Sequence, residues 1–266
     1  MTNPDLRELL DLALEAARRG GALAARGQRG ISVLDTKSSP TDVVTEMDRA
    51  TEELIRDILL DARPDDAILG EEGGAAPGGT GVRWLVDPID GTVNYLYGRA
   101  EWAVSIAAEL DGRAVVGVVE VPVRGQTYSA VRGQGARRNG EPISAAAPVD
   151  LDMALVATGF GYEARRRSRQ ARVLSTVLPR IRDIRRVGSA AIDLCAVAEG
   201  SINAYYERGA HPWDWGAGAL IATEAGARVG GLRGTPPNHD LLLAAAPGLF
   251  EQLHDLLEPL GADSDD

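Results

Sequence analysis

Two carboxylates three residues apart, Asp87 and Asp90, follow directly on the apolar residues 84–86. Carboxylate oxygens at the end of a strand are ligands that hard cations such as Mg²⁺ prefer. Burying both charges beside an apolar run is costly unless a cation compensates them. The next two residues, Gly91 and Thr92, open what reads as a helix, whose free N–H groups favour a phosphate. This turn predicts metal-assisted phosphoryl chemistry.

Four other segments carry residue types that could complete such a site. They are Glu71 at the end of a short strand, Asp214 at a strand-to-helix junction, Lys37 together with Asp48, and the helix entry Gly188, Ser189 and Ala190. Each also has an ordinary structural explanation. Asp214 has the position and residue type of a helix N-cap. The Gly188-Ser189 pair could have no role beyond capping a helix, and the charges of Glu71, Lys37 and Asp48 could simply be solvated.

Two further groups are interpreted as structural. His211, His239 and His254 show no metal-ligand spacing and are expected to be structural or exposed. The arginines between Arg165 and Arg186 are expected to form a solvated face or a subunit interface.

Composition narrows the function classes. The 266 residues are 44% hydrophobic and 25% charged, without an apolar run long enough to span a membrane. The net charge of −11 argues against sequence-independent nucleic-acid binding, which needs a basic face. The polar start does not read as a signal peptide, and the single cysteine, Cys195, fits a reducing compartment. We therefore expect a cytoplasmic protein.

The elements that must position these residues follow from periodicity and turn signals. Helical spacing predicts helices over 5–26, 45–60, 166–177, 189–198, 214–225 and 250–257. Short apolar runs predict strands over 68–72, 82–86, 104–110, 115–121, 127–131, 154–158, 202–207 and 241–246. The run of strands from 82 to 131 indicates an antiparallel meander.

The pattern of predicted elements changes near Asp150, from a run of strands to alternating helices and strands. We therefore predict two lobes, which meet near Asp150, and a short C-terminal tail. Residues 1–150 are expected to form an α+β lobe with most of the candidate metal ligands. Residues 151–260 form a second lobe, with Asp214 and the substrate contacts, packed on the first as one compact unit. The acidic residues 261–266 are predicted to be disordered.

The residues from Trp84 to Asn94 resemble the Asp-Pro-Ile-Asp-Gly-Thr-x-Asn signature of the inositol monophosphatase family of Mg²⁺-dependent, lithium-sensitive phosphatases. Further motifs occur before and after this segment, in the order that they have in the family: residues 37–48, 70–72, 205–207, 213–214 and 224–226. Among bacterial members the chain is most similar to the actinobacterial inositol-1-monophosphatases. The resemblance covers nearly the whole chain. It implies an α+β fold, the layered αβαβα sandwich that the family shares with fructose-1,6-bisphosphatase.

The resemblance also implies two to three Mg²⁺ ions and a homodimer. Glu71, Asp87 and the Ile89 carbonyl would hold one ion; Asp87, Asp90 and Asp214 would hold a second. A third, weaker ion would lie near Glu71, with Lys37 close to it. These residue types suit Mg²⁺, which takes oxygen ligands and keeps several waters.

Further roles are implied for the neighbouring residues. Thr92, paired with Asp48, would orient the attacking water, and the Gly91 and Thr92 amides would bind phosphate. The polyol hydroxyls would contact Glu207 and the backbone at Gly188, Ser189 and Ala190. The predicted substrate is therefore a small phosphorylated polyol, inositol 1-phosphate.

Other activities remain open at this point. Histidinol-phosphate phosphatase, fructose-1,6-bisphosphatase and 3′-phosphoadenosine phosphatase are alternatives on the same scaffold. The residues Phe160-Gly161-Tyr162 depart from other family members near the sugar, so that contact does not carry over. A different class, a regulatory binding partner in transcription or RNA processing, is disfavoured because the implied metal set is complete.

Overall fold

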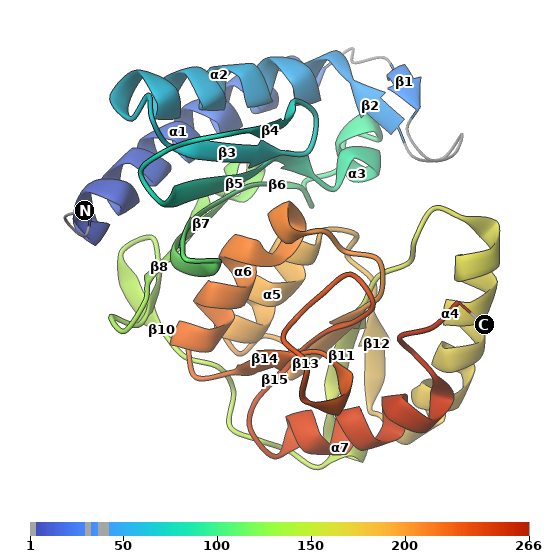
Figure 1. Ribbon diagram of the computed structural model, residues 1–266. Coiled ribbons are helices and arrows are strands. Elements are labelled where there is room, and N and C mark those ends of the chain that lie inside the picture. Colours follow the sequence, from blue (N-terminus) through green and yellow to red (C-terminus); the bar gives the residue numbers. More distant parts are fainter. Residues whose placement is uncertain (1–3, 30–32, 37–42, 266) are drawn as a thin grey trace.

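The computed structural model describes residues 4–29, 33–36 and 43–265, which form five layers in the order αβαβα (Figure 1). The helices are α1 (Leu6–Gly27), α2 (Glu46–Ala62), α3 (Thr92–Leu96), α4 (Ala164–Val177), α5 (Ala190–Ala198), α6 (Pro212–Glu224) and α7 (Leu249–Leu257). Helices α1 and α2 cover one face of the first sheet, α5 and α6 lie between the two sheets, and α4 and α7 cover the second sheet. The layered α+β fold is confirmed.

The first sheet contains eight strands in the order β10-β9-β8-β7-β6-β5-β3-β4. Their bounds are β3 Ala67–Gly70, β4 Gly74–Ala76, β5 Val82–Asp90, β6 Ala103–Leu110, β7 Arg113–Val121, β8 Gln126–Val131, β9 Ala136–Arg138 and β10 Glu141–Ile143. The predicted antiparallel meander is confirmed from β5 to β8. The strand β3 instead runs parallel to β5, so both strands end at the same edge of the sheet.

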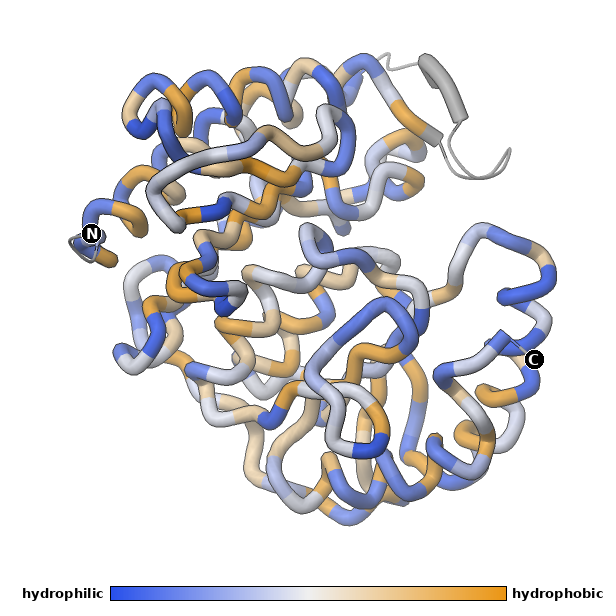
Figure 2. The backbone as a smooth tube through the Cα atoms, in the orientation of Figure 1, coloured by the Kyte–Doolittle hydropathy of each residue, from blue (hydrophilic) through white to orange (hydrophobic). Residues whose placement is uncertain are grey.

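Strand β5 is buried along almost its whole length because helices cover both faces of the sheet. Trp84 and Val86 pack in the cluster beneath α1 and α2, whereas Leu85 packs in the cluster that includes α5 and α6. Side chains along a strand alternate between its faces. A strand buried on both faces needs apolar residues on both, and residues 84–86 supply the short run by which the sequence identified β5. Figure 2 shows hydrophobic stretches in orange on the strands of the first sheet, beneath helices with mixed colours.

The second sheet contains five strands in the order β12-β11-β13-β15-β14. Their bounds are β11 Leu155–Thr158, β12 Asp183–Arg185, β13 Ala204–Glu207, β14 Arg228–Gly230 and β15 Leu242–Ala245. A separate two-stranded sheet pairs β1 (Val33–Thr36) with β2 (Val43–Thr45). The strands that were not predicted from the sequence are β1, β2, β4, β9, β10, β12 and β14, because strands of three or four residues carry too few residues for a period to be visible.

Two predictions need correction. The helix predicted to begin at Asp214 begins at Pro212, so Asp214 occupies the third helical position instead of the N-cap. Residues 261–265 of the acidic tail, predicted to be disordered, have defined contacts: Ala262 is buried and Asp265 forms ion pairs with two arginines. Those ion pairs lie beyond what a local composition signal can detect.

No helix in the described part of the chain has the length and apolar character that crossing a membrane requires.

Candidate active site

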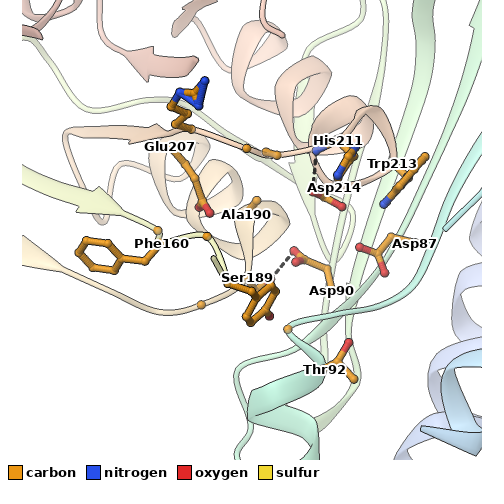
Figure 3. A pocket seen from close by; sticks show the side chains of 18 of the residues that line it. Asp87, Asp90, Thr92, Phe160, Ser189, Ala190, Glu207, His211, Trp213 and Asp214 are labelled. Atoms are coloured by element: carbon orange, nitrogen blue, oxygen red, sulfur yellow. Dashed lines mark hydrogen bonds between the residues drawn. The ribbon is translucent and has the colours of Figure 1, made fainter. Parts of the chain in front are cut away.

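A cavity of about 440 Å³ opens between the two sheets, at the end of β5 (Figure 3). One wall carries carboxylates from the first half of the chain together with Asp214. The other wall carries Glu207, aromatic residues and three arginines from the second half. This size and this mixture of charged and aromatic groups suit a small polar ligand.

The topology of the first sheet explains how three of the carboxylates meet. In the parallel pairing of β3 with β5, Gly70 lies opposite Val86, which places Glu71 next to Asp87. Asp87 pairs with Ser105 and Asp90 pairs with Ala103, so β5 has one extra residue in a bulge at Pro88. Proline donates no ladder hydrogen bond and is tolerated in strands at such bulges.

The bulge decides the direction of Asp90. In a regular strand, residues three apart point to opposite faces. Ser105 and Ala103 lie two apart and share a face of β6, so their partners Asp87 and Asp90 share it as well. Figure 3 shows Asp87, Asp90 and Asp214 gathered around the same space, with Asp90 hydrogen-bonded to Ser189. The one-residue bulge thus converts a spacing of three into a pair of groups on one side.

Burial raises the pKa of Asp87, Asp90 and Asp214. The pKa of Asp87 is well above its usual range because of burial, followed by repulsion from Glu71, Asp90 and Asp214. A hydrogen bond between the carboxyl groups of Asp87 and Glu71 acts in the same direction. Burial also raises the pKa of Asp214 well above normal, and that of Asp90 to about 7. The repulsion is relieved either by protons or by cations.

The donor set fits a hard divalent cation. Two carboxyl groups as close as those of Asp87 and Glu71 need a proton or a cation to relieve their repulsion. Across the residues described, however, no three His, Cys, Asp or Glu side chains are arranged as a complete metal centre. The fit therefore rests on ligand chemistry, on burial and on mutual repulsion.

Asp90 is fixed by a helix from the second half of the chain. Its Oδ2 accepts hydrogen bonds from the Ser189 hydroxyl (2.6 Å) and the Ala191 amide (2.7 Å), at the start of α5. An anion is favoured at a helix N-terminus. The Ser189 hydroxyl also accepts from the Ile192 amide and so caps α5, which confirms the ordinary explanation given for this residue. Its donated proton serves Asp90 rather than a ligand.

Two glycines permit this contact. Gly91 has φ of +99° and Gly188 has φ of +94°, both in the left-handed region that favours glycine. A Cβ on Gly91 would lie 3.1 Å from the Gly188 carbonyl oxygen and 3.0 Å from that of Glu101. A side chain at Gly91 would therefore push the β5 turn away from the loop before α5.

Thr92 and Asp48 are brought together, as the resemblance implied. The Thr92 hydroxyl lies 3.1 Å from Asp48 Oδ1 and 3.1 Å from the Ile89 carbonyl oxygen. The other oxygen of Asp48 accepts from the Thr45 amide and hydroxyl, in a capping box at the start of α2. Burial raises the pKa of Asp48 to about 6, although the hydrogen bonds from Thr45 lower it. Asp48 is fully buried and is not the surface charge that a helix position suggests.

Two residues that position parts of the site were not assigned this role from the sequence. The Glu52 carboxylate accepts from the Glu72 and Gly73 amides, each at 2.7 Å, and so holds the turn that carries Glu71. The Asn94 amide donates to the Glu101 carbonyl (2.7 Å) and the Val187 carbonyl (2.9 Å), which ties the β5 turn to the loop before α5. The signature placed Asn94 in the motif, but only the fold supplies its partner 93 residues away.

Asp214 caps α6 from the third helical position and also lines the cavity. One of its carboxylate oxygens accepts from the His211 amide at 2.7 Å, a capping contact at the start of α6. Its side chain lies near Asp87 and Asp90 on the acidic wall of the cavity (Figure 3). Because a carboxylate has several lone pairs, the capping bond leaves acceptor capacity for a cation.

Glu207 stands on the far side of the cavity, at the end of β13. Its Oε2 accepts from the Tyr205 hydroxyl at 2.6 Å, and burial raises its pKa while that hydrogen bond and Arg186 lower it. The cavity also has on its walls His211 and His239, whose rings lie 4.8 Å apart, and Arg166, Arg186 and Arg208. From the sequence, the two histidines were expected to be structural or exposed, and the arginines between Arg165 and Arg186 to form a solvated face or an interface. No local sequence pattern indicates that these residues lie on one wall of a cavity.

The remaining predicted residues divide as follows. Gly91, Thr92, Ile89, Gly188 and Ala190 all line the cavity. Lys37 lies outside the described residues. Helix α3, predicted to offer its dipole to phosphate, has only five residues, so its dipole is small and the individual amides must provide the attraction.

Comparison with known proteins extends these observations. The profile of the "Inositol monophosphatase family" matches residues 5–261. The chain is 47% identical to "Inositol-1-monophosphatase SuhB" of Mycobacterium tuberculosis, over 95% of each chain. It is 37% identical to "Nus factor SuhB" of Pasteurella multocida, over 97% of this chain and 98% of the relative. A crystal structure of the extragenic suppressor protein suhB from Bartonella henselae superimposes with a TM-score of 0.89 at 31% identity, covering 94% of this chain and 98% of that chain.

These matches extend over nearly the full length of the chain, and the family is generally metal-dependent. The resemblance drawn from the motifs is therefore confirmed. This chain belongs to the inositol monophosphatase family and is a phosphatase.

Proposed function

We propose that this phosphatase hydrolyses inositol 1-phosphate to inositol and phosphate in a Mg²⁺-dependent reaction. The observation that carries the proposal is the set Glu71, Asp87, Asp90 and Asp214, whose carboxylates repel one another around one cavity. Only cations allow all four to be ionised together, and a phosphate monoester needs such cations in order to approach an acidic wall.

We assign the metal ligands as the family resemblance implies. Glu71, Asp87 and the Ile89 carbonyl would hold one Mg²⁺, and Asp87, Asp90 and Asp214 a second. A third would lie near Glu71 and Lys37. Bound ions would neutralise the charge of the phosphate. They would also lower the pKa of water toward neutrality, which makes water a better nucleophile.

The Thr92 hydroxyl and Asp48 would orient the attacking water. Thr92 has one hydroxyl proton, which it donates to Asp48 or to the Ile89 carbonyl, so its lone pairs can accept from a water. Asp48, whose pKa is raised to about 6, is ionised at neutral pH and can accept a proton through Thr92. The Gly91 and Thr92 amides would hold the phosphate oxygens, so that positioning and charge neutralisation supply the catalysis.

The polyol would contact the opposite wall. The Glu207 carboxylate faces the cavity and keeps one oxygen clear of its bond to Tyr205, so it can accept from two adjacent hydroxyls. The backbone at Gly188 and Ala190 would supply further contacts. Ser189 would contribute through its backbone only, because its hydroxyl donates to Asp90.

A substrate panel tests the proposal. Purified protein with Mg²⁺ should release phosphate from inositol 1-phosphate faster than from histidinol phosphate, fructose 1,6-bisphosphate or 3′-phosphoadenosine phosphate, and EDTA should abolish release. Far faster release from histidinol phosphate would overturn the choice of substrate. Equal release with and without EDTA would overturn the role of the carboxylates.

A second function is favoured by the relatives named Nus factor, which are 36–37% identical to this chain. A regulatory role in transcription would need the folded surface but not turnover. If the phenotype of a gene deletion is restored by the Asp90→Asn variant, which lacks a proposed metal ligand, binding is the principal role. If only the active protein restores it, hydrolysis is.

A homodimer, a cytoplasmic location and lithium inhibition complete the proposal. Sedimentation velocity at several concentrations tests the dimer, and the dependence of turnover on LiCl with KCl as a control tests lithium.

A further inference from the structure

The cavity has a second cluster of charge, opposite the carboxylates. Arg166 in the first turn of α4 and Arg208 just after β13 both line it. Arg208 is only 9% exposed. Its Nε donates no hydrogen bond to any described residue. A buried guanidinium needs negative charge and hydrogen-bond acceptors around it, so this position favours an acceptor that carries negative charge.

The C-terminal tail supplies the negative charge at present. Asp265 Oδ1 lies 3.0 Å from Arg208 Nη1, and the same carboxylate receives Arg166 Nε at 3.4 Å and Nη2 at 3.3 Å. Asp240, at 3.7 Å, is a more distant partner of Arg208. The two arginines hold the pKa of Asp265 below its usual range. One carboxylate therefore bridges two guanidinium groups of the cavity wall.

The tail is held in place by contacts outside the cavity. Ala262 is buried among the residues beneath α4 and α7, and Arg169 donates to the Leu260 carbonyl oxygen at 2.6 Å. Asp263 forms an ion pair with Arg233, which does not line the cavity. Loss of the Asp265 carboxylate alone should therefore leave the path of the tail intact.

The arginine pair lies against the loops that border the cavity. A Cβ on Gly161 would lie 2.8 Å from Arg166 Cδ, and a Cβ on Gly209 would lie 2.7 Å from Arg166 Nη1. Both glycines line the cavity. A ligand that fills the cavity from the carboxylates to these loops would bring its distal end to Arg166 and Arg208.

We propose that Asp265 is a specificity-determining residue: it occupies the arginine pair that a second anionic group on the substrate would bind. Its carboxylate imitates that second group from within the chain. The unmodified protein therefore favours phosphomonoesters that carry one anionic group. This inference rests on the proposed function, because it assigns the scissile phosphate to the carboxylate wall.

The experiment compares two substrates that differ by one phosphate, fructose 1-phosphate and fructose 1,6-bisphosphate. In Asp265→Asn, the ratio of kcat/KM for the bisphosphate to that for the monophosphate should rise by about ten-fold, since charge-assisted contacts of this kind produce such changes. The rise should lie in KM. Asp263→Asn is the matched control, because it removes a carboxylate of the same tail away from the cavity.

A double variant separates specificity from loosening of the tail. In Arg208→Gln/Asp265→Asn the ratio should return toward that of the unmodified protein, and in Asp265→Glu it should stay low. An unchanged ratio in Asp265→Asn would overturn the proposal, as would an equal rise in Asp263→Asn.

Binding measured without turnover distinguishes this inference from the proposed function. Calorimetric titration with Ca²⁺ in place of Mg²⁺ should show tighter binding of the bisphosphate, but not of the monophosphate, to Asp265→Asn. If the unmodified protein hydrolyses no phosphomonoester, the proposed function fails. The titration then still decides whether Asp265 screens the arginine pair. An affinity for the bisphosphate that is the same in Asp265→Asn and in the unmodified protein would overturn the screening role.

Discussion

The two walls of the cavity are built in different ways. The acidic wall comes mainly from the ends of β3 and β5, where ladder hydrogen bonds, a bulge and the start of α5 fix Asp87 and Asp90. The opposite wall comes from α4, the end of β13 and the loops beside them, and two of its arginines, Arg166 and Arg208, form ion pairs with Asp265 of the tail. Groups on strands are held more rigidly than groups on loops.

This difference suggests a division of labour. The charge neutralisation and water positioning proposed for the acidic wall need accurate placement, which a buried sheet edge provides. Recognition of different leaving groups tolerates adjustment, which the loop wall provides. Changes to the acidic wall should therefore act on kcat, and changes to the opposite wall on KM and on substrate choice.

The largest expected effect is at Asp90. Asp90→Asn keeps the shape of the side chain but removes a charge that the proposed metal site needs, so kcat should fall by at least about a thousand-fold. Steady-state phosphate release measures it. Asp57→Asn, on the exposed face of α2, is the control and should stay within two-fold of the unmodified protein, roughly the scatter of surface substitutions. If Asp90→Asn kept a tenth of the activity, the assignment of catalysis to the acidic wall would be wrong.

Removing the metal should make the acidic wall sensitive to pH. Burial raises the pKa of Asp48 from 3.8 to about 6 and that of Asp90 to about 7, so the folded protein binds these protons more tightly than the unfolded chain does. This stabilisation is complete below pH 3.8 and is lost as the pH rises through 6 and 7.

The metal-free protein should therefore lose a few kcal/mol between pH 5 and pH 8, which corresponds to a fall in Tm on the order of 5–10 °C. Mg²⁺ should remove the dependence, because cations replace the protons. Differential scanning calorimetry in EDTA and in Mg²⁺ measures both. A Tm that rises with pH in EDTA would contradict the assignment.

The Thr92 hydroxyl provides a sharper test of the same wall. Thr92→Val keeps the volume but removes the bond to Asp48, so kcat should fall by about a hundred-fold with KM almost unchanged. Thr92→Ser retains the hydroxyl and should lose less than about ten-fold. Equal losses in both variants would indicate that packing, rather than the hydroxyl, matters at this position.

The smallest effect is expected on the opposite wall. Glu207→Gln should raise the KM for inositol 1-phosphate by about ten-fold and change kcat by only a few-fold, since one charged hydrogen-bond acceptor is lost from binding. Glu53→Gln, exposed on α2, is the control. A fall in kcat as large as the rise in KM would show that Glu207 acts in the chemistry, and the contrast between the walls would then fail.

Much of the fold was predictable because its signals are local. Strand β5 is apolar on both faces, α1 and α2 carry one apolar stripe each, and the meander turns contain glycine. The carboxylates of the acidic wall were predictable because they lie in short motifs. Positioning residues such as Glu52 and Asn94 were not, since each acts on a backbone segment far away or on a turn that no pattern links to it.

The sequence by itself determined the family, the layered fold and the carboxylates of the acidic wall, because contiguous motifs and apolar runs encode them. Only the tertiary structure decided which side chains face them. The bulge at Pro88 turns Asp90 toward Asp87, the start of α5 fixes Asp90, and the folded tail brings Asp265 to Arg166 and Arg208. Contacts between residues about a hundred positions apart depend on the packing of whole elements, and no local spacing records them.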